Sequence, residues 1–565
     1  MPPKFSRPTI RKTIYSKSVN NQTRTSPCEA ACPAGNPIQK IHSLIEEGKR
    51  TKALEYLQAR NPLAGVTGRI CNYPCESVCN RGSYDEAVSI RQLERFAADC
   101  ADNSPLKIPQ KKSPSGKKVA VIGAGPAGLT CAYFSALLGH EVVIFEAAPV
   151  LGGIPRLLAP DYKLPKDIVD RHVGRILSMG ITARTNVHVG KDIAFATIRE
   201  NFDACLISVG TVRDRKPDFP GAELALPALS FLKKVNLGQE VTIGDRVVIL
   251  GGGGVAFDCA FTARRLGASE VSIVCVEGEE CMCVGPEDIQ QARAEIIRVL
   301  SSSLACEIQH DHGELKGVNY FKVADFSFDQ RCRLSVERCS EQTHFLPADS
   351  VISAIGVQSD FSFLEHTDDL TFTSKGTLSA DNGTMSTSIN GVFAAGDAAS
   401  GPSSVAAAIG SGRQVAIAIH RYLCGERENK DVVVDSSGQV VERDQGKLEE
   451  PHIVEFTEIL NIWHHPKGKR QQAGGALVDN YMRLRSELVK GLGEAKAKIE
   501  AGRCLHCGHC TSCGTCVEDC PGMILEMTDC GPAVAYPEEC WHCGCCRIAC
   551  PSSAVSYEFP LHMLV

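Results

Sequence analysis

The sequence predicts an α/β fold in which one Rossmann-like unit is inserted into another, between a helical cysteine-rich domain and a cysteine-rich α+β domain. Two observations carry this prediction. Residues 119–146 and 246–277 each show a buried strand, a glycine-rich turn, a helix and a second strand that ends in glutamate. Fifteen of the 28 cysteines lie at C-x2-C or C-x3-C spacing in clusters near the two ends of the chain. Such clusters in a large chain are typical of metal ligands rather than of disulfides.

The first unit carries a complete dinucleotide-binding fingerprint. Its turn has the pattern G-x-G-x-x-G and follows a β-branched strand. The first glycine of such a turn allows the sharp bend, the second lets the backbone approach a pyrophosphate, and the third lets helix and strand pack closely. A carboxylate that ends the second strand is placed to hold a ribose hydroxyl. The predicted binding residues are Gly123, Gly125, Gly128 and Glu146.

The second unit repeats the fingerprint with alanine at the third small position. An acidic residue at the end of the second strand favours a free 2′-hydroxyl, so NAD(H) is favoured over NADP(H). Arg264 and Arg265 remain candidate partners for a 2′-phosphate. The predicted nicotinamide-dinucleotide residues are Gly251, Gly253, Ala256 and Glu277.

The C-terminal cysteines give the most specific pattern in the chain. They form two runs of C-x2-C-x2-C-x3-C-P. In ferredoxins with two 4Fe-4S clusters, the fourth cysteine of each run binds the other cluster. Zinc ribbons also use C-x2-C pairs, but two complete runs favour iron. One predicted ligand set is Cys510, Cys513, Cys516 and Cys550, and the other is Cys520, Cys540, Cys543 and Cys546.

The N-terminal cysteines follow a different pattern, with a helix pair predicted over residues 38–60 from apolar spacing. The motifs are Cys28-x3-Cys32-Pro33, Gly68-Arg69-Ile70-Cys71, Pro74-Cys75-Glu76, Cys79 and Ile90-x2-Leu93-Glu94-Arg95-Phe96. Together they resemble the N-terminal iron–sulfur domain of the glutamate synthase small-subunit family. Dihydropyrimidine dehydrogenase and the large subunit of the NADH-dependent ferredoxin:NADP oxidoreductase share that domain.

The resemblance implies two further 4Fe-4S clusters, one of which has a Glu or Gln ligand. The family usually has a C-x2-C pair before the first of these motifs, and this sequence has none there. An Arg-Cys-x2-Cys stretch next to the C-terminal runs supplies the missing pair, so the two chain ends are expected to meet. By the family's pattern one cluster takes Cys28, Cys79, Cys504 and Cys507, and the other takes Cys32, Cys71, Cys75 and Glu94.

The resemblance also assigns the rest of the FAD site. It implies that Gly153, Gly396 and Asp397 contact FAD, with Asp397 at the ribityl chain. Between the first turn and residue 503, the sequence has no pair of cysteines with C-x2-C or C-x4-C spacing. A disulfide reductase is therefore disfavoured, and electrons are expected to leave the flavin singly through the clusters.

The predicted domains follow from these motifs. A return of the chain to the FAD domain is placed at residues 351–356, and a long solvated helix at residues 478–501. The domains are a helical iron–sulfur domain (1–110), the first segment of the FAD domain (117–245), an NAD(P) domain (246–350), the second segment of the FAD domain (351–425), a linker with the helix (426–503) and a ferredoxin domain (504–565).

The net charge of −6 gives no reason to expect nucleic acid, and no apolar run is long enough to span a membrane. We expect a cytoplasmic FAD- and NAD(P)H-dependent iron–sulfur oxidoreductase. Its partners would be ferredoxin or other subunits of an electron-transfer complex, and by analogy the complex could bifurcate electrons. The alternatives are a glutamate synthase small-subunit-type electron donor and a non-catalytic electron-wiring scaffold that binds no nicotinamide.

Overall fold

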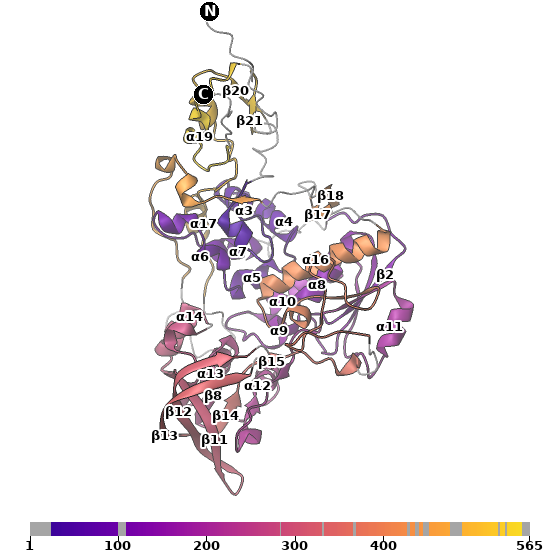
Figure 1. The fold of residues 1–565 in the computed structure, drawn as a ribbon, viewed down its shortest axis with the longest axis vertical. Helices are drawn as coiled ribbons and strands as arrows, with labels where there is room; N and C mark the ends of the chain where they lie inside the picture. The colour runs from indigo at the N-terminus through magenta and orange to yellow at the C-terminus, as the bar shows by residue number, and fades with distance from the viewer. Residues whose placement is uncertain are drawn as a thin grey trace, which may run out of the picture.

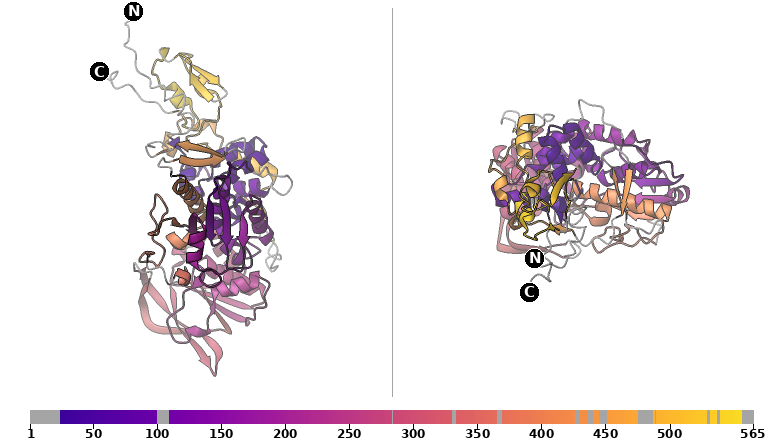
Figure 2. Two further views of the ribbon diagram at one scale, coloured as in Figure 1. Left: turned by 90° about the vertical axis from the view of Figure 1, so that its right-hand side faces the viewer. Right: turned by 90° about the horizontal axis from the view of Figure 1, so that it is seen from above.

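The computed structural model describes residues 24–99, 109–282, 284–329, 333–364, 369–425, 430–434, 440–444, 451–474, 487, 489–528, 531–536 and 539–555. The chain is elongated. The C-terminal module lies at one end, the N-terminal helices lie next to it, and the two Rossmann-like units follow (Figure 1). The left-hand view in Figure 2 shows the same order.

Short helices form the N-terminal domain around one core. The predicted helix pair is confirmed as α3 (Ile38–Glu46) and α4 (Arg50–Gln58). Their apolar faces meet each other and the helix α7 (Ile90–Ala98), where Ile41, Leu54 and Leu93 are fully buried. The other elements are α2 (Pro27–Ala31), α5 (Ala64–Ile70), α6 (Pro74–Ser77) and η2 (Asn80–Ser83).

A five-stranded parallel sheet forms the first Rossmann-like unit, as predicted. Buried apolar strands covered on both faces are the pattern that a parallel sheet requires. In spatial order the strands are β16 (Val392–Ala394), β5 (Ala204–Ile207), β2 (Lys118–Ile122), β3 (Glu141–Phe145) and β4 (Thr182–Arg184). The helices include α8 (Pro126–Leu137), α9 (Gly153–Leu157), α10 (Lys166–Leu177), α11 (Phe195–Asn201), α15 (Asp397–Ser400) and α16 (Val405–Cys424).

A second five-stranded parallel sheet forms the inserted unit. In spatial order its strands are β10 (Arg298–Leu300), β9 (Glu270–Val274), β8 (Arg246–Leu250), β14 (Ser350–Ser353) and β7 (Leu226–Pro227). Its helices are α12 (Ala228–Asn236), α13 (Gly254–Arg265) and α14 (Pro286–Ala294). An antiparallel sheet of β11 (Ser303–Asp311), β12 (Glu314–Phe328) and β13 (Leu334–Pro347) packs against it.

The predicted return of the chain to the first unit at residue 351 is wrong. The strand there is β14, which pairs with β8 in the middle of the second sheet, with Val351 opposite Val248. The chain returns to the first sheet only at β16. A buried apolar run fits either sheet equally well, so its pairing is decided by tertiary contacts. The antiparallel pair β6 (Arg213–Asp214) and β15 (Val357–Gln358) links the two units.

The C-terminal region contains the predicted α+β module, and the long helix predicted at residues 478–501 is confirmed only at its end. In the described residues the helix is α17 (Glu494–Ala501), and residues 489–493 are not helical, since Gly491 and Gly493 disfavour a helix. Residues 478–486 and 488 of that prediction lie outside the described residues. The other elements are β1 (Arg24–Thr25), β17 (Lys430–Val434), β18 (Val440–Asp444), β19 (His452–Ile453), α18 (Thr515–Glu518), β20 (Leu525–Thr528), β21 (Gly531–Val534) and α19 (Cys545–Ala549).

Within the described parts of the chain, we find no helix with the length and apolar character needed to cross a bilayer.

Candidate functional site

A large cavity, here called the dinucleotide cavity, opens between the two Rossmann-like units. It offers about 400 Å³ of space to water-sized groups. One wall comes from the first unit and the other from α12 of the second, through Leu229 and Lys233. No cysteine is among the described residues that line it. The predicted FAD residues in its wall are Gly123, Gly125, Glu146, Gly153, Gly396 and Asp397.

The glycines of the first turn differ in what a side chain would meet. A Cβ on Gly128 would lie 2.0 Å from the carbonyl oxygen of Gly123, so this glycine is needed for close packing of helix and strand. A Cβ on Gly125 would meet nothing within 4 Å, and its φ of −74° suits any L-residue. The protein alone therefore does not require glycine at position 125. A pyrophosphate held against the backbone would require it.

Two carboxylates project into the dinucleotide cavity. The oxygens of Glu146 accept hydrogen bonds from the N–H groups of Ala124 and Ala148, both at 2.7 Å, so the backbone fixes the carboxylate at the end of β3. Asp397 accepts a hydrogen bond from the Ser403 hydroxyl at 2.7 Å, and burial raises its pKa. Both groups are acceptors that suit the hydroxyls of a ribose or a ribityl chain.

The second turn has the same construction. Gly253 has a φ of −84°, and a Cβ there would also meet nothing within 4 Å. Ala256 is fully buried in α13. Glu277 lies beside the turn, where its Oε2 would be 2.7 Å from a Cβ on Gly252. In the described structure this buried Oε2 has no hydrogen-bond partner. An unpaired buried carboxylate oxygen next to a dinucleotide turn fits a ribose hydroxyl.

The two arginines considered for a 2′-phosphate are both engaged elsewhere. Arg264 donates from Nη1 to the carbonyls of Ala268 and Ser269, both at 2.7 Å. Arg265 is buried in a two-pronged ion pair with Glu295, with N–O distances of 2.8 and 3.0 Å. A guanidinium held this way is not available to a phosphate unless the pair breaks.

The sixteen predicted cluster ligands line four small cavities, four in each. Each cavity spans between 310 and 360 Å³ of space free of protein atoms, part of it open to solvent. Among the described side chains, no three His, Cys, Asp or Glu residues converge on the position of a single metal ion. Cavity I is lined by Cys32, Cys71, Cys75 and Glu94, cavity II by Cys28, Cys79, Cys504 and Cys507, cavity III by Cys510, Cys513, Cys516 and Cys550, and cavity IV by Cys520, Cys540, Cys543 and Cys546.

One local turn recurs at all four cavities. In each, the N–H two residues after a cysteine donates to that cysteine's Sγ at 3.4 Å, and the donating residue has a positive φ. Such a turn directs the sulfur into the cavity and offers it a donor, as a metal thiolate requires. The pairs are Cys71 with Tyr73, Cys504 with His506, Cys510 with Ser512, and Cys540 with His542.

The chemistry of cavity I fits an iron–sulfur cluster with one carboxylate ligand. Burial raises the pKa of Cys32 to about 12 and that of Cys71 to about 11. Burial also raises the pKa of Glu94 to about 7, and its Oε1 accepts a hydrogen bond from Asn36 at 2.8 Å. Buried sulfurs and a buried carboxylate ionise readily only beside a strong positive charge, which the irons of a cluster supply.

Cavity II joins the two ends of the chain, as predicted. Asn80, from the N-terminal domain, donates from Nδ2 to the Sγ of Cys507 at 3.4 Å. The strand β1 pairs in parallel with β19 nearby. Two contacts that the sequence does not reveal lie in this wall: His42 of α3, and the Ser26 hydroxyl 3.1 Å from the Sγ of Cys28.

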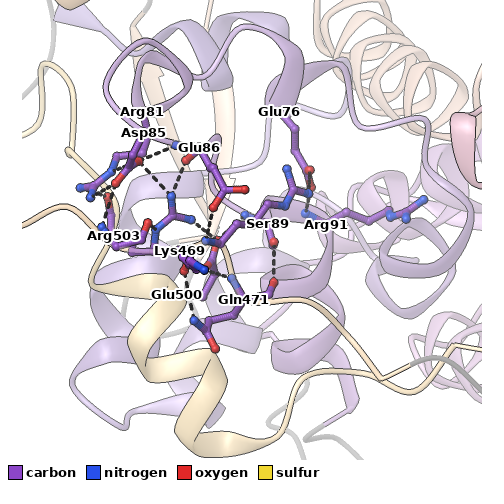
Figure 3. A network of polar contacts seen from close by, with 12 residues as sticks. Glu76, Arg81, Asp85, Glu86, Ser89, Arg91, Lys469, Gln471, Glu500 and Arg503 are labelled. Carbon is purple, nitrogen blue, oxygen red and sulfur yellow. Dashed lines mark hydrogen bonds and ion pairs between the residues drawn. The ribbon is translucent and has the colours of Figure 1, made fainter.

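A buried polar network fixes the C-terminal segment onto the N-terminal domain beside cavity II (Figure 3). Arg81 holds both oxygens of Asp85, at 2.7 and 2.6 Å, and donates to the Arg503 carbonyl at 2.9 Å. Arg503 bridges Asp85 and Glu500, at 3.0 and 2.8 Å. Glu500 is fully buried and also accepts from the Ser89 N–H at 2.7 Å. The network therefore holds Arg503, and with it the adjacent Cys504, against the N-terminal domain.

The dinucleotide cavity and cavities I to IV form a series in which each cavity shares a helix or a short segment with the next. Helix α16 contributes Val405 to the dinucleotide cavity and Ala406 to cavity I. Helix α7 begins with Ile90 in the wall of cavity II and Arg91 in that of cavity I. Cavities II and III are joined through residues 507–510, and cavities III and IV share α18 and α19 with their flanking cysteines.

We predict that Gly125→Val yields a folded chain that does not retain FAD. The valine side chain would occupy the space where the pyrophosphate approaches, while the backbone stays unstrained. We expect FAD binding to weaken at least about tenfold, since each hydrogen bond to a charged group contributes roughly 1.5–3 kcal/mol. Circular dichroism and flavin content measure the two effects. Gly174→Val in α10, which is also open within 4 Å, is the control and should keep its flavin; equal loss in both variants contradicts the assignment.

These features define a class: a flavoprotein with paired dinucleotide-binding units and several candidate iron–sulfur sites. Residues 117–412 match the pyridine nucleotide-disulphide oxidoreductase family, and residues 19–105 match the 4Fe-4S domain described as dihydropyrimidine dehydrogenase domain II. The chain belongs to the pyridine nucleotide-disulphide oxidoreductase family.

Relatives resemble this chain over about 70% of its length. The NADP(+)-dependent formate dehydrogenase subunit beta of Moorella thermoacetica is 34% identical over 71% of this chain and 60% of its own length. The NADPH-Fe(3+) oxidoreductase subunit beta of Geobacter sulfurreducens is 31% identical over 71% and 64%. The glutamate synthase [NADPH] small chain of Mycobacterium tuberculosis is 33% identical over 70% and 86%. The chain thus spans less than two thirds of the first two relatives.

Proposed function

We propose that this chain is an electron-transferring subunit that exchanges hydride with NAD(P)H at FAD and single electrons with a partner through four 4Fe-4S clusters. The flavin supplies the conversion between two-electron and one-electron chemistry. The protein holds FAD in the dinucleotide cavity with the first turn, Glu146 and Asp397. It holds the clusters with the sixteen side chains of cavities I to IV.

The observation that carries the proposal is the continuous series of cavities. Neighbouring cavities share a helix or a short segment, from α16 at the dinucleotide cavity to α19 at cavity IV. A partner would therefore exchange electrons at the C-terminal module, which lies at the end of the elongated chain (Figure 1). The described cysteines are all free thiols, which suits a reducing compartment, and we propose the cytoplasm.

We further propose that NADH is the preferred nucleotide. The buried Oε2 of Glu277 lacks a partner in the described structure, and a 2′-hydroxyl would supply one. A 2′-phosphate would instead face this carboxylate, while Arg264 and Arg265 are engaged elsewhere. The named relatives use NADP(H), so the preference rests on these residues alone.

The test is an anaerobic titration with NADH and, separately, NADPH, following flavin and cluster absorbance together. We expect NADH to bleach both. In Glu277→Gln we expect kcat/KM for NADH to fall about 10- to 100-fold, because a hydrogen bond to a charged group contributes roughly 1.5–3 kcal/mol. Glu280→Gln, the same change at an exposed position nearby, should behave as the native protein.

Each outcome has a distinct meaning. Faster reduction by NADPH contradicts the nucleotide preference and leaves the electron-transfer proposal standing. Reduction by dithionite but by neither nucleotide contradicts the proposal and favours the electron-wiring scaffold. A glutamate synthase small-subunit role is supported by the similarity to that chain, which covers 70% of this one. Whether a complex containing this chain bifurcates electrons is a separate proposal, tested by whether NADH reduces two acceptors of different potential at once.

A further inference from the structure

His42 occupies a position typical of an apolar core residue. It lies on the inward face of α3, between the buried Ile41 and Leu44, and is 1% exposed. In the described portion of the chain, neither ring nitrogen has a hydrogen-bond partner. Burying a polar group without a partner is destabilising, so such groups are rare in folded proteins. A residue of this kind needs a partner that the polypeptide does not supply.

The ring of His42 lines cavity II, together with the four cysteine sulfurs. Burial lowers the pKa of His42 to about 3, so its imidazole is neutral and carries one N–H donor. Three of the sulfurs already have polar neighbours: Asn80 donates to Cys507, the N–H of His506 donates to Cys504, and the Ser26 hydroxyl lies 3.1 Å from Cys28. The cavity side of the ring therefore faces the space that a cluster would fill.

In cavity I the amide that lines the wall does not donate to a cysteine sulfur. Its buried amide, Asn36, donates to the carboxylate of Glu94 instead. Cavities III and IV have more exposed walls, with Cys513 and Cys543 open to solvent. Cavity II thus has the most deeply buried cysteines of the four cavities, and the Asn80 amide and the Ser26 hydroxyl lie beside two of them. Hydrogen bonds to sulfur and exposure to solvent are two of the factors that set cluster potentials.

We propose that His42 donates a ring N–H hydrogen bond to a sulfur of the 4Fe-4S cluster in cavity II and thereby raises the reduction potential of that cluster. This inference rests on the proposed function, which places a cluster there. A donor stabilises the reduced cluster more than the oxidised one, because the reduced cluster carries more negative charge. His42 thus adjusts the reduction potential of the cluster in cavity II, the second cluster counted from the flavin.

The test compares three variants by redox potentiometry monitored with electron paramagnetic resonance. In His42→Phe we expect the midpoint potential of one cluster to become more negative, with the other three unchanged. In His42→Gln, which keeps an N–H donor, we expect a smaller shift of the same cluster. Ile45→Val, which trims the same buried face of α3 without lining cavity II, should shift none. Four intact clusters with no shift in His42→Phe overturn the inference.

A second measurement needs no variant and keeps the inference testable if His42→Phe loses its cluster. Native protein labelled with ¹⁵N only in the histidine imidazole rings is reduced and studied by pulsed electron paramagnetic resonance, because the backbone N–H groups of His506 and His542 already donate to cysteine sulfurs. We expect a ¹⁵N coupling on one cluster signal, and its absence from all signals contradicts the hydrogen bond. Iron and sulfide content separates the two proposals, since fewer than four clusters in native protein refutes the proposed function and not only the role of His42.

Discussion

Cys504→Ser is expected to remove one of the four clusters, although Cys504 is remote in sequence from the cysteines it joins. It lines cavity II with Cys28 and Cys79, and a 4Fe-4S cluster takes one ligand for each of its four irons. Iron content should therefore fall by about a quarter. NADH should still bleach the flavin, but electrons should no longer reach cavities III and IV, because cavity II lies between them and the flavin. Dithionite should still reduce the C-terminal clusters directly.

The matched control for this prediction is Cys545→Ser. Cys545 is adjacent to Cys546 but lines none of the four cavities in the described structure. It should keep its full iron content and its electron transfer. If Cys504→Ser retains all its iron and its cluster spectra, cavity II has a different set of ligands.

Arg503→Met is expected to destabilise the chain strongly and to loosen the wall of cavity II. The change leaves Glu500, which is fully buried, without its charged partner, and removes a contact to Asp85. Breaking a buried ion pair by removing one partner costs about 3–5 kcal/mol. We expect a lower unfolding temperature together with partial loss of one cluster, measured by thermal denaturation and iron content.

Lys498→Met provides the contrast within the same segment. Lys498 pairs with Glu494 at 3.0 Å on the exposed side of α17, where both side chains are open to solvent. An exposed pair of this kind contributes little to stability, because water and salt screen the two charges. This variant should unfold close to the native temperature. Equal destabilisation by the two substitutions contradicts the structural role of the buried network.

The cysteine sets could be predicted from sequence because their geometry is largely local. In a C-x2-C segment, the turn that directs the sulfurs is formed by the intervening residues, as at Cys510 and Cys540. Both glycine turns could be predicted for the same reason. The completion of cavity II by Cys504 needed a count of ligands and a family resemblance, since nothing local links it to Cys28.

What could not be predicted depends on contacts between distant segments. The strand at 350–353 is apolar enough for either sheet, and its place beside β8 is a property of the whole fold. His42 has the helical spacing of a core residue, so its sequence neighbours do not reveal the cavity beside it. The network around Arg81 and Arg503 joins residues 422 positions apart.

Cavity II can close only late in synthesis, because its walls come from distant parts of the sequence. Asn80 and Cys507, which meet there, are 427 positions apart. At roughly 5–20 residues per second, a ribosome needs about 20 to 90 s to travel from one to the other. Until then the N-terminal domain presents two thiols and the ring of His42 on an unfinished surface. A cluster at this position would therefore have to be inserted after Cys507 has been synthesised, and a product that ends before Cys504 lacks two of the four predicted ligands.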